Sequence, residues 1–200
     1  MIRKELLAVV ASEVTVCTKC PLWKTRRDAV PGEGSAKSKI MFIGEAPGRS
    51  EDAQGRPFVG TAGKFLDELL SEIGLSREDV FITNVVKCRP PRNRAPKSLE
   101  VQTCTPYLDR QTRIIKPRFI VTLGNYATAY IFSNAKLPFS GITQAHGKPH
   151  EVALLGLKAI VFPMFHPATV LYNPKYKTML RQDFQSLNDE LERTLHSRKS

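Results

Sequence analysis

The sequence predicts a single-domain α/β fold in which helices cover both faces of a central, mainly parallel sheet. Short apolar runs typical of buried strands alternate along the chain with segments whose apolar residues recur at helical spacing. The 200 residues are 42% hydrophobic and 24% charged, which is ordinary for a globular domain. Because no repeat, low-complexity block or linker interrupts them, we expect residues 1–200 to form one three-layer α/β/α domain.

The first half of the chain supplies two helices and two strands. An N-terminal helix is expected over residues 2–12, within a helical region of about residues 1–16. One side of this helix carries Ile2, Leu6, Val9 and Val10. A buried strand then ends at Gly44, a helix over 63–74 stops at Gly74, and a second strand covers 79–86.

The second half continues the alternation. Ser98 is a candidate cap for a helix over residues 99–115, and Asn173-Pro174 opens a C-terminal helix over 174–195. The elements between them are strands at 118–124, 151–155 and 158–165, with a helix at 125–133 and a turn containing Gly156.

In parallel sheets the working residues gather beyond the carboxyl ends of the strands. This rule selects four stretches, at residues 44–48, 84–88, 124–125 and around His166. The sequence therefore places the chemistry of the protein at that edge of the sheet.

The charge of the chain indicates a polyanionic partner. The formal net charge is +11 and the pI is about 9.7, and lysine and arginine gain affinity for nucleic acid by displacing counterions from phosphates. A proline-rich loop concentrates this charge in Lys87, Arg89, Arg92, Arg94 and Lys97. Solubility alone is the other explanation of a basic chain.

We expect a cytoplasmic protein that does not enter a membrane. No apolar run approaches the roughly 18–20 residues that a spanning helix needs. The N-terminal apolar stretch is interrupted by Glu5 and Glu13, which fits an amphipathic helix better than a secretory signal.

The four cysteines predict a metal site. Cys17 and Cys20 form a C-x2-C pair, and Cys88 and Cys104 form a wider second pair. In a reducing compartment, four thiolates match one tetrahedral sulfur site that holds either zinc or an iron–sulfur cluster. The wide second spacing is unlike that of a zinc ribbon and favours the cluster, whereas four cysteines packed as small apolar residues would leave the close pair unexplained. Such a site would hold the N-terminal helix to the basic loop.

The glycine-rich loop after the first strand does not match a nucleotide-binding loop. Gly44 and Gly48 flank Glu45-Ala46-Pro47, so the dinucleotide fingerprint is absent, and the carboxylate of Glu45 would repel a phosphate. We therefore expect no nucleotide cofactor.

Several motifs together resemble one known family. The stretches "GEAPGRSEDAQGRPFVGTAGKFLDELL", "TNVVKCRPPRNRAPKSLEVQTCTPYL" and "HPATVLYNP", with the four cysteines, are similar to the family-four (iron–sulfur) uracil-DNA glycosylases over about residues 17–177. The resemblance implies a 4Fe–4S cluster on Cys17, Cys20, Cys88 and Cys104, a four-stranded parallel sheet, and removal of uracil from DNA after cytosine deamination. One departure is Ala168, where the family often has serine.

The resemblance also implies a pocket for a uracil flipped out of DNA. Its uracil-binding residues would be Gly44, Glu45, Ala46, Phe58, Asn84 and His166. Phe58 would stack on the base, and the amide of Asn84 would pair with the ring N–H and the neighbouring carbonyl of uracil. His166 and backbone N–H groups near Glu45 would stabilise the uracil anion, while Glu45 would orient or activate the attacking water. Glu45 and His166 are thus the expected catalytic residues.

Contacts to DNA are expected from two segments. The first is the basic loop with Arg89, Arg92, Arg94 and Lys97. The second follows His166, where Val170, Leu171 and Tyr172 are candidate wedges and Lys175 and Lys177 are candidate phosphate contacts. His146 and His150 are expected to be surface residues and His196 to be uninvolved, whereas Glu51 and Asp52 are expected only to shape or solvate their loop.

Two other functions compete for the same residues. A superfamily variant that bonds covalently to uracil-DNA carries a reactive histidine in an inserted loop, but no histidine lies between Cys88 and Cys104. A noncatalytic DNA-binding protein would keep the cysteines and the basic loop without needing Glu45, Asn84 and His166 together at strand ends. We expect a monomer whose partner is uracil-containing DNA. A sliding clamp is a further candidate partner, although no convincing clamp-binding motif is present.

Overall fold

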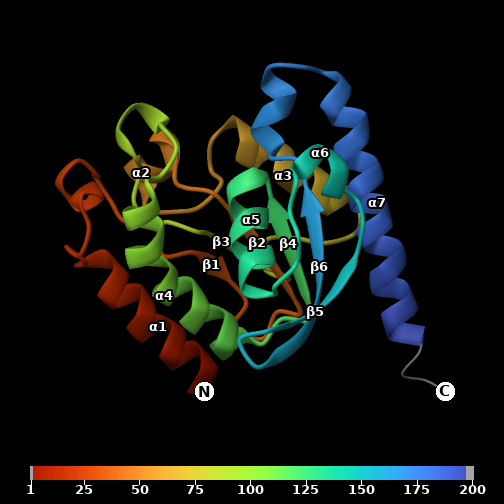
Figure 1. Ribbon diagram of the computed structural model, residues 1–200, viewed down its shortest axis with the longest axis horizontal. Helices are drawn as coiled ribbons and strands as arrows, with labels where there is room; N and C mark the ends of the chain where they lie inside the picture. Colours follow the sequence, from red (N-terminus) through yellow and green to blue (C-terminus); the bar gives the residue numbers. More distant parts are fainter. Residues whose placement is uncertain (1, 197–200) are drawn as a thin grey trace.

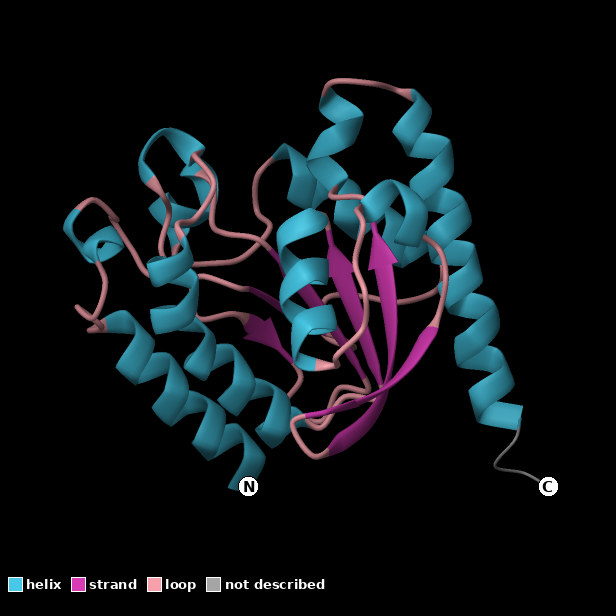
Figure 2. Cartoon of the chain, viewed as in Figure 1, coloured by secondary structure: helices cyan, strands magenta, loops and turns pink. Residues whose placement is uncertain are grey.

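The computed structural model describes residues 2–196 and has an α/β architecture, as predicted. One sheet is flanked by helices on both faces (Figures 1 and 2). Its strands are β1 (Glu33–Gly34), β2 (Ile40–Gly44), β3 (Phe81–Asn84), β4 (Phe119–Leu123), β5 (His150–Leu154) and β6 (Leu157–Met164). The helices are α1 (Ile2–Thr15), α2 (Arg49–Gln54), α3 (Thr61–Glu72), α4 (Ser98–Ile115), α5 (Asn125–Asn134), α6 (Ile142–Ala145) and α7 (Lys175–His196). Short 3-10 turns lie at Pro21–Lys24, Pro91–Asn93 and Pro167–Leu171.

The sheet has six strands, so the prediction of four strands is wrong in number. The strand order is β1-β3-β2-β4-β6-β5, and the four central strands are mutually parallel. The edge strands β1 and β5 pair antiparallel to β3 and β6. The strands β5 and β6 form a hairpin whose two turn residues, Leu155 and Gly156, have φ values of 53° and 79°, as a type I′ turn requires.

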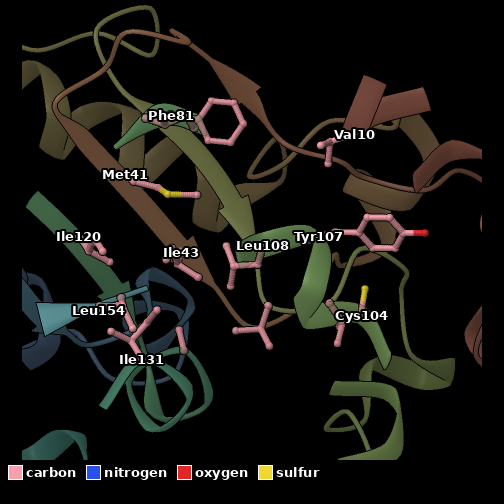
Figure 3. Packing of buried hydrophobic residues seen from close by; sticks show 14 of the residues in the cluster. Val10, Met41, Ile43, Phe81, Cys104, Tyr107, Leu108, Ile120, Ile131 and Leu154 are labelled. Atoms are coloured by element: carbon pink, nitrogen blue, oxygen red, sulfur yellow. The ribbon is translucent and has the colours of Figure 1, made fainter. Parts of the chain in front are cut away.

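The central strands are buried on both sides because their residues alternate between two apolar cores. Met41 and Ile43 of β2 pack in the core beneath α1, α4 and α5, together with Leu108 (Figure 3). Ile40 and Phe42 point to the opposite face and pack in the core beneath α3 and α7. This two-residue period fixes the register of the strand and keeps its carboxyl end at one edge of the sheet.

Helix ends follow local signals in the sequence. Gly74 adopts φ +71° after α3, as expected of a glycine that ends a helix. Asn173 caps α7, since its side-chain oxygen accepts a hydrogen bond from the N–H of Lys175 at 3.1 Å. The cap of α4 is Lys97 and not Ser98, because the carboxylate of Glu100 accepts the N–H of Lys97 at 2.7 Å.

The side of helix α1 that packs against the core differs from the predicted side. Its buried residues are Val10 and Val14, whereas Ile2, Leu6 and Val9 are 72%, 46% and 52% exposed. The helix lies along α4 at the edge of the molecule (Figure 1), so only a narrow stripe is covered. No helix within residues 2–196 is both long and apolar enough to cross a membrane.

Candidate active site

A pocket of about 320 Å³ lies beyond the carboxyl ends of β2, β3 and β6. Five residues that the sequence places in a uracil site line it together, namely Glu45, Ala46, Phe58, Asn84 and His166. They come from four separate segments of the chain, and the parallel sheet brings these segments to one edge. The volume is in the range of small-molecule sites.

The floor of the pocket depends on Gly44, the last residue of β2. A Cβ atom at this position would lie 2.4 Å from Oδ1 of Asn84 and 2.6 Å from Cζ of Phe58. Both distances are far shorter than a van der Waals contact, so only glycine allows the two side chains to approach the backbone here. The absence of a side chain at residue 44 is therefore what brings Asn84 and Phe58 together.

Glu51 holds the loop between Gly44 and Phe58 in shape. One carboxylate oxygen accepts the N–H groups of Val59 and Gly60 at 2.9 and 2.8 Å, and the other accepts the N–H of Gly48 at 3.1 Å. Three backbone donors from two segments thus converge on one side chain. The neighbouring Asp52 accepts the N–H of Arg27 at 3.0 Å, which joins the loop to the cysteine segment. Both carboxylates therefore shape the loop.

Phe58 is a buried residue with a left-handed backbone, at φ 51°. This unfavourable conformation is supported by Arg77, whose guanidinium donates to the carbonyl oxygens of Pro57 and Phe58 at 2.6 and 3.1 Å. Gly63 lets α3 pass close by, because a Cβ atom there would lie 1.8 Å from the Phe58 oxygen. The Phe58 ring stacks against His166 with a centroid distance of 5.5 Å.

Asn84 ends β3 and is 1% exposed. Its side-chain Oδ1 is buried and has no hydrogen-bond partner among the described residues. The backbone around it is fixed, since Val85 and Val86 donate their N–H groups to the carbonyl oxygens of Gly44 and Glu45 at 2.9 and 3.1 Å. A buried acceptor without a donor is costly, so this oxygen is prepared for a donor from a ligand.

His166 follows β6 and is held in one tautomer. Its Nδ1 accepts the N–H of Ala168 at 3.1 Å, which leaves the proton on Nε2. Burial lowers the pKa of His166 to about 4, and the negative charge of Glu51 opposes this only in part. The ring is therefore neutral at pH 7 and presents Nε2–H as a hydrogen-bond donor.

Glu45 is half-buried at the pocket wall, directly after β2. Burial raises the pKa of its carboxyl above the ordinary value for glutamate. Its carbonyl oxygen is held by the N–H of Val86, whereas the side chain is left to face the pocket. The site thus pairs a carboxylate of raised pKa with a histidine of lowered pKa.

The four cysteines surround one small cavity, lined by Cys17, Cys20, Cys88 and Cys104. Two of the sulfur atoms accept hydrogen bonds, Cys88 from the Arg26 guanidinium at 3.1 Å and Cys104 from the N–H of Lys87 at 3.2 Å. Tyr107 projects from α4 beside Cys104 (Figure 3). Donors of this kind surround metal-bound thiolates, and the donor set fits a four-sulfur site.

The cysteine side chains line this cavity without forming a closed coordination shell. Within residues 2–196, no three Cys, His, Asp or Glu side chains are close enough together to hold a metal ion. Burial raises the pKa of the Cys104 thiol to about 12, so the thiolate form requires a cation to stabilise it. The four sulfur atoms and their hydrogen-bond donors are thus gathered at one cavity.

A family model described as the Uracil DNA glycosylase superfamily matches residues 31–192, a span that includes every pocket residue named above. The chain belongs to this superfamily. A type-4 uracil-DNA glycosylase of Saccharolobus solfataricus is 52% identical over 186 residues, which cover 92% of this chain and 86% of that protein. A type-4 enzyme of Archaeoglobus fulgidus is 48% identical over 185 residues, with 92% and 93% covered. A type-5 enzyme of Pyrobaculum aerophilum is 32% identical over 167 residues, with 76% and 70% covered.

The basic loop of this superfamily member reaches the rim of the pocket through Pro90, Asn93 and Arg94. Arg92 and Lys97 are exposed, and the half-buried Arg89 donates to the Asn93 side chain at 2.7 Å. The Arg94 guanidinium is engaged within the protein, since it donates to the carboxylate of Glu100 at 2.6 and 2.8 Å. The loop therefore presents some of its charges to solvent and uses Arg94 to hold its own shape.

Lys87 is not one of the charged residues that the basic loop exposes to solvent, contrary to the expectation from the sequence. It is 1% exposed, and its ammonium group bonds to three oxygens inside the protein. The sequence grouped it with the loop because it is adjacent to Cys88, but the chain is still buried at that point.

The segment after His166 lies on the other side of the same pocket. Leu171 and Tyr172 are 56% and 87% exposed, and Tyr172 lines the pocket. Val170 instead packs partly against the core beneath α3 and α7. Lys175 is exposed at the start of α7. Two segments about 75 residues apart in sequence thus frame the opening.

The remaining histidines differ from the expectation of surface residues. Nδ1 of His146 lies 3.0 Å from the buried carboxylate of Asp183, and its ring contacts Phe165 at a centroid distance of 4.4 Å. His150 packs on Phe132, and its Nε2 is buried. These two residues are structural. His196 is the last residue of α7.

The sequence did not indicate how Glu51, Asn93 and Arg77 support the site. Glu51 has a signal that could have found it, because a glutamate three residues after the capping Gly48 is a typical helix start. Asn93 adopts φ 55°, which asparagine tolerates better than most residues, and this favours it in the turn at the pocket rim. Arg77 lies in a turn and gives no sequence signal, because all its partners, the carbonyls of Pro57 and Phe58 and two carboxylates, are distant in the sequence.

Proposed function

We propose that this chain is a uracil-DNA glycosylase that draws uracil out of DNA and hydrolyses its N-glycosidic bond, which leaves an abasic site. This reaction begins base excision repair of deaminated cytosine. The observation that carries the proposal is the buried, unpartnered Oδ1 of Asn84 in a pocket shared with Phe58, His166 and Glu45. The names and the identities of the type-4 relatives, 46–53% over most of this chain, support it.

Base recognition follows from the hydrogen-bonding pattern of Asn84. Its Oδ1 accepts the N3–H of uracil, and its Nδ2 donates to the O4 carbonyl. Cytosine has an acceptor and an amino group at these two positions. Oδ1 of Asn84 would then face another acceptor and Nδ2 would face another donor, so neither hydrogen bond could form. A mismatch of this kind in a buried site rejects the wrong base strongly. Phe58 covers the face of the base.

His166 stabilises the leaving group. As the bond between sugar and base breaks, uracil takes the bonding electrons and negative charge develops on its O2. The Nε2–H of the neutral imidazole donates a hydrogen bond to this oxygen, with backbone N–H groups near Ala46 as further donors. A neutral imidazole suits this task because it donates a hydrogen bond while keeping its proton, so it does not have to be protonated again.

Glu45 acts on the sugar side of the bond. Its carboxylate orients a water molecule toward C1′ and stabilises the cation-like sugar. The water oxygen forms the new bond to C1′, its proton is taken up by the carboxylate, and the uracil anion departs. The raised pKa of Glu45 makes it a stronger base than an exposed glutamate.

The metal centre has a structural part in this proposal. Cys17, Cys20, Cys88 and Cys104 would hold a 4Fe–4S cluster, with zinc as the alternative ion. When bound, the group supplies four metal–sulfur bonds that fasten the chain on both sides of the basic loop. A brown colour with visible absorption, together with iron analysis, distinguishes the cluster from colourless zinc.

DNA would lie across the rim of the pocket. The exposed charges of Arg92, Lys97 and Lys175, together with Arg89, would contact phosphates. Leu171 is well placed to fill the gap left by the flipped base, whereas the packing of Val170 makes it a support for this wedge. Arg94 would act mainly by holding the loop against Glu100.

The test is incubation with oligonucleotides that contain U·G, U·A, T·G or no lesion, followed by cleavage of abasic sites. We expect strand cleavage for both uracil substrates and none for the undamaged duplex. A protein that binds these duplexes tightly without cleavage would instead be a noncatalytic DNA-binding protein.

A further inference from the structure

Lys87 is a buried lysine that the proposed mechanism does not use. It is 1% exposed, yet its ammonium group donates to Oγ1 of Thr83 at 2.5 Å and to Oε1 of Gln111 at 2.8 Å. The third donor goes to the backbone oxygen of Asn84 at 2.8 Å. Lysine is almost never fully buried unless it is paired, and no ion pair of Lys87 is found within the described part of the chain. Three neutral oxygens match its three donors instead.

The acceptors of Lys87 are themselves fixed. Gln111 of α4 donates to the carbonyl oxygen of Pro31 at 2.7 Å, and the hydroxyl of Thr83 donates to the same oxygen at 3.0 Å. Each member of the network thus has a partner on both sides, so the ammonium position is determined by groups from three segments. A lysine placed so firmly can hold a neighbouring stretch of backbone in turn.

That stretch is the bend directly after Asn84, the last residue of β3, which leads to Cys88. On one side the bend is bonded to the loop of the catalytic carboxylate, through Val86 and the carbonyl oxygen of Glu45. On the other side the backbone N–H of Lys87 donates to the sulfur of Cys104 at 3.2 Å. The Lys87 side chain closes the bend internally by reaching back to Asn84.

We propose that Lys87 is a positioning residue for base recognition: it fixes the backbone of Asn84 so that the buried amide faces uracil at the correct angle. This inference depends on the function proposed above. The peptide after Asn84 is held at both ends, its carbonyl by Lys87 and its N–H by the Gly44 oxygen, so the backbone at Cα of Asn84, and with it the direction of the side chain, is fixed. Lys87 would therefore contribute to uracil recognition without touching the base.

A different role for Lys87 makes other predictions. A buried positive charge beside four thiolates could serve only to balance the charge of a metal centre. In that case replacement of Lys87 would lower the metal content and the stability of the protein. The fold-loss of activity would then be the same with Asn84 present or replaced. The two roles separate in a double-mutant cycle.

The experiment compares wild type, Lys87→Met, Asn84→Ala and the double variant, with Lys158→Met as a control that removes one exposed lysine outside the site. Single-turnover excision from U·G DNA gives the maximal rate and the half-saturating concentration for each, and iron and zinc per chain are measured in the same samples. Because Lys87→Met removes a buried hydrogen bond and leaves Asn84 misplaced, we expect it to reduce excision efficiency by about tenfold or more. In the Asn84→Ala background the same change should have an effect of about twofold or less.

An equal fold-loss in both backgrounds overturns the proposal, as does a loss of activity that only follows the loss of metal. Wild-type protein that fails to excise uracil would contradict the proposed function instead, so the two failures are distinguishable. If Lys87→Met does not fold, the same cycle is run with Lys87→Gln, whose shorter side chain keeps an N–H donor, and the same criterion applies.

Discussion

At the scale of single residues, the site depends on two ionisable groups whose pKa values are moved in opposite directions. Burial raises the pKa of Glu45 and lowers that of His166 to about 4. Near pH 7 the site therefore contains a carboxylate and a neutral imidazole, which are the forms that the proposed mechanism needs as base and as donor. The sequence predicted both residues as catalytic, but it could not predict these pKa shifts, because they arise from the packing of distant segments.

The first prediction concerns pH. As pH falls, Glu45 is protonated first, at a pH above the usual range for glutamate, while His166 stays neutral until about pH 4. The acid side of the profile of kcat/KM should therefore report Glu45 alone. Excision measured between pH 4 and 9, at constant ionic strength, checks this. An acid limb that persists in the residual activity of Glu45→Gln would contradict the assignment.

The second prediction concerns base discrimination by Asn84. The change Asn84→Asp leaves an oxygen that can still accept uracil N3–H, but the second oxygen replaces the donor to O4 and must be protonated to bond to it. We expect the ratio of excision efficiencies for uracil and cytosine to fall by about tenfold or more. Parallel assays on U·G and C·G duplexes measure the ratio, and an unchanged ratio would count against base reading by this residue.

At the scale of elements, the sequence predicted best where a local signal determines the structure. Asn173 before Pro174 begins a helix, and Gly74 ends one, because capping and a left-handed backbone are local requirements. The facing of α1 was wrong because Ile2, Leu6 and Val9 form an apolar stripe that stays exposed, and nothing local in the sequence shows that the neighbouring stripe is the covered one. Only the position of α4 decides that Val10 and Val14 are covered.

The third prediction concerns the loop that Glu51 holds. In Glu51→Ala three backbone N–H groups lose their acceptor, so the segments that carry Glu45 and Phe58 are no longer fixed relative to each other. We expect kcat/KM for excision to fall by about tenfold to a hundredfold, since small misplacements of catalytic groups are this costly. Glu68→Ala, which alters an exposed residue of α3, is the control. Equal activity of the two variants would refute the role of Glu51.

At the scale of the whole molecule, the sequence predicted the parallel centre of the sheet and the edge at which the site lies. Runs such as residues 40–44 and 119–123 are buried throughout and apolar apart from Thr122, as expected of a sheet covered on both faces. The edge strand β1 could not be predicted, because its two residues, Glu33 and Gly34, carry no apolar pattern. It exists through pairing with β3, which is a tertiary contact.

The fourth prediction concerns the proposed metal site, whose four cysteines lie after α1, after β3 and in α4. Removal of its metal, or the change Cys104→Ser, should lower the melting temperature and weaken DNA binding, because the two ends of the basic loop are no longer fastened together. Thermal denaturation and duplex binding, each with and without a chelator that extracts the metal, measure both effects. A chelated protein that keeps its melting temperature would show that the site has no structural part.

The central claim is that the pocket beyond the strand ends performs uracil excision with Glu45 as its carboxylate. Single-turnover excision from a U·G duplex by Glu45→Gln, set against its binding affinity for the same duplex, tests this claim most directly. We predict a rate reduced by about a hundredfold or more with affinity within about threefold of wild type, because the amide preserves the shape of the site and loses the base. A parallel fall in rate and affinity, or an unchanged rate, would contradict the claim.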